Sequence, residues 1–95
     1  MSRERLIDRV VEGDGKASRE ARRAAFANAG VTPEAVRALI DKVARSAWKI
    51  SDEDIAAAKA AGLTEDQIFE LVVCAAVGAA KRQHDAARAA LAEVK

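Results

Sequence analysis

The chain has 95 residues, the size of one domain, with a formal net charge of +1 and charged residues making up 33% of the sequence. This balance gives no electrostatic reason to expect nucleic acid or an anionic membrane as a partner. One cysteine and one histidine exclude an intrachain disulfide and an ordinary zinc site. Neither a membrane-length apolar run nor a signal peptide stands out. We therefore expect a single cytoplasmic domain over residues 1–95, without a metal or another cofactor.

The first thirty residues predict two short helices. Apolar residues at helical spacing indicate an amphipathic helix over residues 2–12, and the glycine-rich stretch 13–16 ends it. Ser18 can cap a second helix. We expect that helix to run through Phe26 and to stop near Gly30, a residue type typical of helix C-termini.

The middle of the chain predicts two further helices with a short joint between them. Thr32 is expected to cap the third helix, with Pro33 at its first helical position and an apolar stripe that continues to Ala47. Ser51 and Asp54 have the spacing of a capping box, which predicts the start of a fourth helix. The acidic residues that follow Ser51 also complement the helix dipole.

A long fifth helix is predicted to begin after Gly62, at a second capping box formed by Thr64 and Gln67, and to cover residues 65–94. At 1.5 Å per residue it would be about 45 Å long, so its far end should project or pack on a partner. Residues 71–80, LVVCAAVGAA, are apolar all round, which predicts burial on every side. One small subunit has few elements to supply that burial, so we expect a homo-oligomer with this helix at its centre.

The stretch DKVARSAWKISDEDIAAAKAAGLTEDQIFELVVCAAVGAA, residues 41–80, resembles the alkylhydroperoxidase D-like, or carboxymuconolactone decarboxylase, superfamily. The resemblance extends over residues 34–93, and residues 1–30 add the N-terminal helices. Its best landmark is Ala58 followed by Gly62, Leu63 and Thr64. The resemblance implies a small all-α bundle that assembles into trimers, hexamers or related homo-oligomers.

The resemblance also implies a redox motif, Cys-x-x-Cys-x-x-x-His, which the chain lacks. Counting back from Gly62 places the two cysteines at Ala47 and Ile50 and the histidine at Asp54. Alanine and isoleucine supply neither the attacking thiolate nor the resolving thiol of dithiol chemistry. We therefore expect the fold and assembly of the superfamily without its redox activity, and a pocket lined by Ala47, Trp48 and Ile50.

Asp54, Glu70 and Lys49 are the candidate catalytic residues. Asp54 and Lys49 could form an acid–lysine pair for proton transfer, although acids in a first helical turn more often serve as caps. Glu70 lies among apolar residues, where a carboxylate is costly unless it is paired. Superfamily members carry a catalytic glutamate on a neighbouring helix, and a salt bridge to Lys42, Arg45 or Lys49 is the alternative for Glu70.

The other reactive or aromatic side chains have structural explanations. Cys74 is expected to be a small buried hydrophobe rather than a nucleophile. His84 is expected to be solvated, and Trp48 to be an anchor in the core or in an interface. A cluster of arginines in the second helix could hold an anion, but a solvated helix face is the usual role of such a cluster. These arginines are Arg19, Arg22 and Arg23.

Three functions remain open, and they leave it undecided whether the protein is an enzyme. The first is a carboxymuconolactone decarboxylase-like scaffold or interaction protein without a redox dithiol. The second is a non-redox acid/base enzyme of the decarboxylase or hydro-lyase type. It would act on a small acidic or lactone substrate through Asp54 and Glu70, with Lys49 as charge partner. The third is a single-cysteine peroxidase-related protein that uses Cys74.

Overall fold

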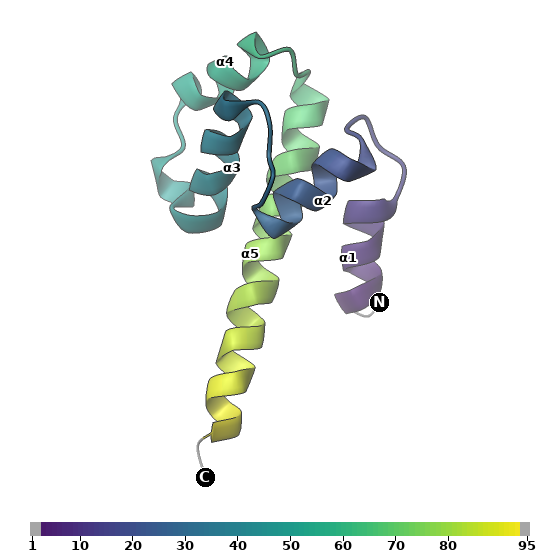
Figure 1. Cartoon of the computed structure of the whole chain (residues 1–95), viewed down its shortest axis with the longest axis vertical. Coiled ribbons are helices and arrows are strands. Elements are labelled where there is room, and N and C mark those ends of the chain that lie inside the picture. Colours follow the sequence, from purple (N-terminus) through teal and green to yellow (C-terminus); the bar gives the residue numbers. More distant parts are fainter. Residues whose placement is uncertain (1–2, 94–95) are drawn as a thin grey trace.

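The computed structural model describes residues 3–93, and these form an all-helical chain (Figure 1). The elements in chain order are α1 (Arg3–Glu12), α2 (Arg19–Ala27), α3 (Glu34–Arg45), a 3-10 turn η1 (Ala47–Lys49), α4 (Asp52–Ala60) and α5 (Glu65–Glu93). No residue of the range 3–93 lies in a β-strand. The prediction of an all-α domain with about five helices is confirmed.

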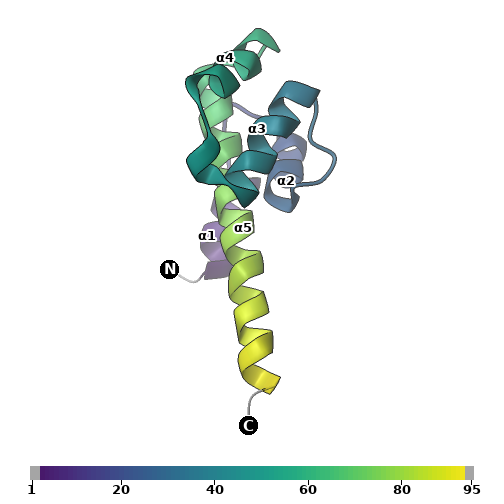
Figure 2. The same ribbon diagram turned by 90° about the vertical axis from the view of Figure 1, so that its left-hand side faces the viewer.

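Helix α5 is the axis of the molecule. The other four helices surround its first half, and its second half extends away from them, as the two perpendicular views show (Figures 1 and 2). The most deeply buried large side chains are Val36, Leu39 and Ile40 of α3 and Cys74 of α5. The hydrophobic core therefore lies between the first half of α5 and the helices that pack against it.

Side-chain caps fix the starts of three helices where the sequence predicts them. The Ser18 hydroxyl accepts the N–H of Ala21 at 3.0 Å at the start of α2. Ser51 and Asp54 form the predicted capping box of α4. At the start of α5, Thr64 and Gln67 exchange two hydrogen bonds between side chain and backbone, at 2.9 and 3.1 Å. The joints between helices are thus encoded locally.

Helix α2 ends two residues earlier than predicted. Asn28, with φ of 51°, takes the left-handed conformation that closes the helix, and its N–H bonds to the carbonyl of Ala25 at 3.2 Å. Asparagine tolerates this conformation better than most residues, so it replaces the expected glycine as the terminator. Gly30, with φ of 71°, lies in the connection that follows.

Helix α3 is shorter than predicted at both ends. The carbonyl of Pro33 accepts two N–H groups of the first turn at 3.0 Å, so Pro33 is the N-cap residue and Thr32 lies outside the helix. Ser46, with φ of −152°, interrupts the helix at its other end. Ala47 therefore belongs to the 3-10 turn η1 and does not continue the apolar stripe of α3.

Within a single chain, residues 71–80 are buried on one side only, so their burial on every side stays a prediction that requires a partner. One stripe of α5 is buried by the chain itself, and Ala76 and Ala80 remain exposed. The buried stripe comprises Leu71, Cys74, Ala75, Gly78 and Ala79. A Cβ atom added at Gly78 would lie 1.9 Å from the carbonyl oxygen of Phe26, so α2 crosses α5 at a distance that only glycine permits.

The far half of α5 projects from the globular part, as its predicted length requires. Every residue from 82 to 93 is exposed, and the longest extent of the molecule is 51 Å against 29 and 20 Å in the other directions. None of the described helices combines the length and the apolarity that a membrane crossing needs. The projecting half-helix is thus a polar and alanine-rich rod that no other described element covers.

Candidate functional site

Asp54 lies at the start of α4, where it caps the helix and joins it to α3. Its carboxylate accepts the N–H of Ser51 at 2.9 Å and the ammonium of Lys42 at 2.9 Å to each oxygen. These bonds, that of Lys42 first, hold the pKa of Asp54 below its usual value. A carboxylate held ionised by a cap and a lysine is a weak candidate for a proton-accepting base.

Lys49, predicted as the charge partner of the candidate acids, makes a different contact. Its ammonium lies 5.7 Å from the centre of the Trp48 ring, a distance suited to a cation–π contact. Trp48 is 78% exposed, so it is not a core anchor in this chain. Ala47 is also exposed, and only Ile50 of the predicted pocket packs against the core. Lys42, not Lys49, is the lysine that binds Asp54.

Glu70 is held by the loop between α1 and α2. Its carboxylate accepts the N–H of Lys16 at 2.8 Å to each oxygen and the N–H of Ala17 at 2.7 Å. Within the chain these bonds replace the salt bridge to α3 or η1 that the sequence suggested. A Cβ at Gly15 would lie 2.1 Å from Oε1 of Glu70, so the loop closes tightly around the carboxylate. Glu70 therefore fastens residues 15–17 to α5.

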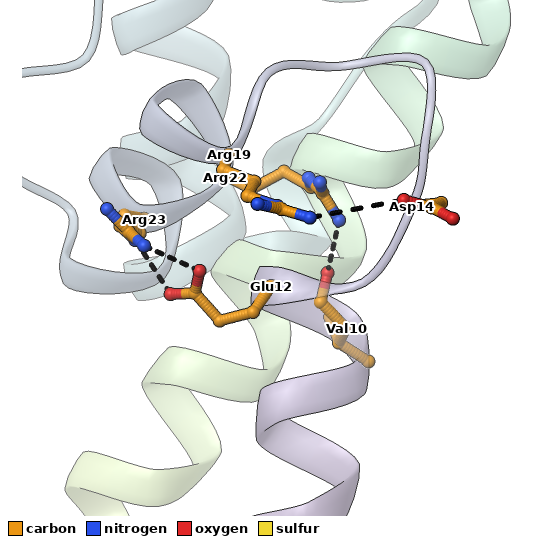
Figure 3. A network of polar contacts seen from close by, with 6 residues as sticks. All are labelled: Val10, Glu12, Asp14, Arg19, Arg22 and Arg23. Carbon is orange, nitrogen blue, oxygen red and sulfur yellow. Dashed lines mark hydrogen bonds and ion pairs between the residues drawn. The ribbon is translucent and has the colours of Figure 1, made fainter.

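Arg22 departs from the expectation of a solvated arginine cluster, because it is only 4% exposed. Its Nη1 donates to the carbonyl oxygen of Val10 at 3.2 Å, near the C-terminus of α1 (Figure 3). Its Nε is buried and has no hydrogen-bond partner within the described residues. The thiol of Cys74 donates to the same carbonyl at 3.6 Å. Arg22 and Cys74 thus attach α1 to α2 and α5.

The other two arginines of the cluster remain at the surface. Arg23 binds the carboxylate of Glu12 with two hydrogen bonds of 2.6 and 2.7 Å, and Arg19 lies 4.0 Å from Asp14 (Figure 3). Both pairs link α2 to the end of α1 or to the loop after it. Exposed ion pairs of this kind contribute little to stability, and they use the charges that an anion would need.

Cys74 is fully buried, which confirms its prediction as a small core residue. Burial raises the pKa of its thiol, Arg22 opposes that shift, and Glu70 adds to it. A buried thiol with a raised pKa forms little thiolate near neutral pH, and thiolate is the reactive species. His84, the only histidine, is exposed on the second half of α5, as predicted.

Several surface hollows adjoin α5, and three of them concern the candidate residues or the exposed side of this helix. One of about 200 Å³ lies beside Glu70 and Arg22 and is also lined by Phe69 and Val73. Two larger, mostly apolar hollows flank α5. The first, of about 480 Å³, is lined by Ile55, Glu65, Asp66, Ile68, Phe69 and Val72. The second, of about 410 Å³, is lined by Leu6, Ile7, Val77, Ala80, Lys81 and His84.

No cluster of His, Cys, Asp and Glu within residues 3–93 is arranged to hold a metal.

The surface of α5 carries a feature that the sequence predictions missed. Phe69 is 67% exposed and Leu91 is 72% exposed, and apolar residues at intervals of three, four and seven residues lie between them on one side of the helix. We call this stripe the outer face of α5, and it comprises Phe69, Val73, Ala76, Ala80, Ala87 and Leu91. The same spacing is visible in the sequence once the helix is known to continue past residue 80.

No protein-family model, curated protein or solved structure matches the chain. The resemblance to the alkylhydroperoxidase D-like superfamily therefore stays a prediction that rests on the landmark at residues 58–64. The function has to be inferred from the contacts and surfaces of the chain itself.

Proposed function

We propose that this protein is a cytoplasmic, non-redox interaction protein of the alkylhydroperoxidase D-like type, which assembles with copies of itself through the outer face of α5. The assembly is expected to be of the trimeric or hexameric kind that the resemblance implies. The small helical bundle would serve as the scaffold that presents this face.

The observation that carries the proposal is the exposure of large apolar side chains on α5. Phe69 and Leu91 leave most of their surface in water, and both lie on a helix whose far half no described element covers. Complete burial of a side chain of this size in a contact would contribute about 1.5–3 kcal/mol to the free energy of association. An exposed apolar stripe that is flanked by two mostly apolar hollows is typical of a protein–protein contact.

The polar groups at the predicted active site favour the same conclusion. Asp54 is occupied by its cap and by Lys42, and Lys49 lies over Trp48 instead of beside an acid. The positions that the resemblance assigns to redox cysteines hold Ala47 and Ile50. Asp54 thus has a structural role between α3 and α4, and Lys49 makes its contact within η1.

One observation favours the alternative of an acid/base enzyme for a small acidic or lactone substrate. Glu70 lines the hollow of about 200 Å³ together with the buried Arg22, whose Nε has no partner in the described part of the chain. A substrate carboxylate or lactone carbonyl in this hollow would lie beside the guanidinium side chain of Arg22. Thermal melting with a panel of small carboxylic acids and lactones tests this alternative, and unchanged melting temperatures would remove it.

Sedimentation velocity over a range of concentrations tests the proposed assembly. We expect the wild-type chain to form oligomers and the variant Ala80→Glu to shift to monomer, because the substitution places a charge in the outer face. Ala38→Glu is the matched control, since Ala38 is an exposed alanine on α3. A wild-type chain that stays monomeric at every concentration, or equal effects of the two variants, would contradict the proposal.

A further inference from the structure

The outer face of α5 lies on the opposite side of the helix from the stripe that the chain buries. Leu71, Cys74 and Gly78 point into the globular part. Val73, Ala80 and Leu91 lie at intervals of seven and eleven residues, which return to the same side of a helix. From Phe69 to Leu91 this face is about 33 Å long. The partner that fits it must therefore present a long, nearly straight apolar ridge.

The first turn of α5 carries acidic residues, whereas its second half carries basic residues together with Asp85 and Glu93. Glu65 and Asp66 lie in its first turn, whereas Lys81, Arg82 and Arg88 lie in its second half. Glu65 pairs with Lys59, Lys81 pairs with Asp85, and Arg82 donates to the carbonyl of Phe26 at 2.7 Å. Asp66 and Arg88 keep no such partner among the described residues. A second α5 in the reversed direction would bring each Asp66 near the Arg88 of the other copy.

The apolar surface of α5 is also complementary to that of a second, antiparallel copy, because a projecting side chain lies near one end and a hollow near the other. The hollow of about 480 Å³ lies beside the first turns of α5, and Leu91 projects near the opposite end. For two antiparallel helices centred between residues 78 and 79, Leu91 and Asp66 are both about 19 Å from the centre along the axis. Leu91 of each copy would then enter the hollow of the other.

The middle of α5 allows this close approach. Ala76 and Ala80 are exposed at the centre of the outer face, and Val77 lies between them at intermediate exposure. Small side chains at a crossing let two helix axes come to the lower end of the usual 8–10 Å spacing. The larger side chains, Phe69 and Leu91, lie near the ends of this face, and the hollow of about 480 Å³ lies beside Phe69.

The size of the contact also favours the antiparallel direction. A face about 33 Å long on a helix about 10 Å wide gives about 330 Å² per copy, less than the roughly 800 Å² of a standard interface. The globular part surrounds only the first half of α5 (Figure 1). In an antiparallel pair, the projecting half of each α5 would lie along α1 and α4 of the other copy, which adds to the buried area. In a parallel pair, the projecting halves meet only each other, and Arg88 faces Arg88.

We infer that the partner of the outer face is a second copy of this chain, bound antiparallel through α5 around a two-fold axis near residue 78. The inference rests on the proposed function, because it specifies the arrangement within the proposed homo-oligomer. Each copy supplies Leu91 as the inserted residue and the hollow beside Phe69 as its receptor, so the contact is isologous. Such pairs give assemblies with an even number of subunits, of which a hexamer is one.

Site-specific cross-linking distinguishes the directions. The variants Ala80→Cys and Ala87→Cys each carry one exposed cysteine, and the wild-type chain is the control because its Cys74 is buried. Two residues 80 would be offset by about 5 Å along an antiparallel pair, and two residues 87 by about 25 Å. We expect a short bis-maleimide to link Ala80→Cys subunits efficiently and Ala87→Cys subunits weakly. Equal linking of both variants indicates a parallel pair and overturns the inference.

Charge reversal tests the predicted pairing of Asp66 with Arg88. We expect Asp66→Arg alone and Arg88→Asp alone each to raise the dimer dissociation constant about tenfold, and the double variant to restore it, because the two pairs in a dimer are reversed together. Sedimentation equilibrium measures the constants. Additive losses in the double variant contradict the arrangement. A trimer as the only oligomer also overturns it but leaves the proposed self-association standing, whereas a wild-type monomer overturns both.

Discussion

The two halves of α5 belong to one continuous helix but differ in almost every physical respect. The first half, up to Ala80, carries all six buried residues of α5 on one stripe and is surrounded by four helices. The second half, residues 81–93, has five alanines and one leucine among mostly charged neighbours, and residues 82–93 are all exposed. Both halves have high helix propensity, so propensity does not distinguish them.

The difference shows which part of the helix depends on tertiary contacts. The first half gains its stability from side chains that touch α2 and α3, and it includes the glycine over which α2 crosses. The second half has its own backbone hydrogen bonds, local ion pairs such as Lys81 with Asp85, and a hydrogen bond to another helix, from Arg82 to the carbonyl of Phe26 at 2.7 Å. An isolated helical segment of about thirteen residues is marginal in water, so the second half relies on the first to nucleate it or on a partner to cover it.

The largest expected effect comes from Gly78→Ala in the first half. The new Cβ would lie 1.9 Å from the carbonyl oxygen of Phe26, and a backbone atom cannot rotate away. We expect a loss of about 3 kcal/mol or more in unfolding free energy, measured by urea denaturation. Helix propensity alone predicts a gain of about 1 kcal/mol, and the control Ala86→Gly in the second half should lose about that amount. A stabilised Gly78→Ala protein would contradict the close crossing.

Replacing one leucine by alanine in each half of α5 compares how much the same side chain contributes to stability in the two halves. Leu71→Ala removes a buried side chain and should cost about 2–4 kcal/mol, because the surrounding core cannot close the cavity completely. Leu91→Ala removes a side chain that is 72% exposed, so the free subunit should lose less than about 0.5 kcal/mol. Urea denaturation of dilute protein measures both. The comparison fails if Leu91→Ala costs the dilute subunit as much as Leu71→Ala.

Replacing one glutamate by glutamine in each half of α5 gives a smaller difference in stability. Glu70→Gln keeps the shape of the side chain but loses one of the two acceptor oxygens that bind the N–H groups of Lys16 and Ala17. Charge-assisted hydrogen bonds to backbone contribute more than neutral ones, so we expect a loss of about 2 kcal/mol. Glu93→Gln, at the exposed end of α5, should be nearly neutral. Equal effects in chemical denaturation would mean that Glu70 does not fasten the loop.

The smallest effect is the dependence of stability on acid. Hydrogen bonds to Lys42 and Ser51 lower the pKa of Asp54 in the folded state, so its contribution is complete above the ordinary value of 3.8 and is lost as pH falls through the lower folded value. Glu12, Asp41 and Glu65 have lowered pKa values for similar reasons. We expect the urea concentration at the midpoint of unfolding to decrease when the pH is lowered below about 4. Asp54→Asn should make that fall shallower, and an unchanged slope would show that Asp54 contributes nothing to it.

The helix order and most of the capping could be predicted because both are local. Ser18, Ser51 and Thr64 cap the helices that their spacing indicates, and the all-α class follows from the apolar periodicity. The boundaries that differ depend on which of two adjacent residues accepts a backbone bond. At the end of α2, Asn28 takes the left-handed conformation before Gly30 is reached.

The candidate site was predictable in its residue types but not in its pairings. The sequence suggests Asp54 beside Lys49, whereas the fold pairs it with Lys42, twelve residues away on another helix. Glu70 was expected among lysines and arginines, and it binds the backbone of a loop more than fifty residues distant. Arg22 was expected at the surface, and a contact with the end of α1 buries it. Long-range contacts of this kind have no signature in local spacing.

The sequence by itself determined that the chain is helical, where the helices begin, and that the fifth helix exceeds the width of the domain. Propensity, caps and periodicity act over a few residues, so they can be read along the chain. Only the tertiary structure decided which side of α5 is buried and which charges pair. Those outcomes depend on how α1 to α4 cross α5, and the closest crossing, at Gly78, leaves Phe69 and Leu91 on the side that remains open.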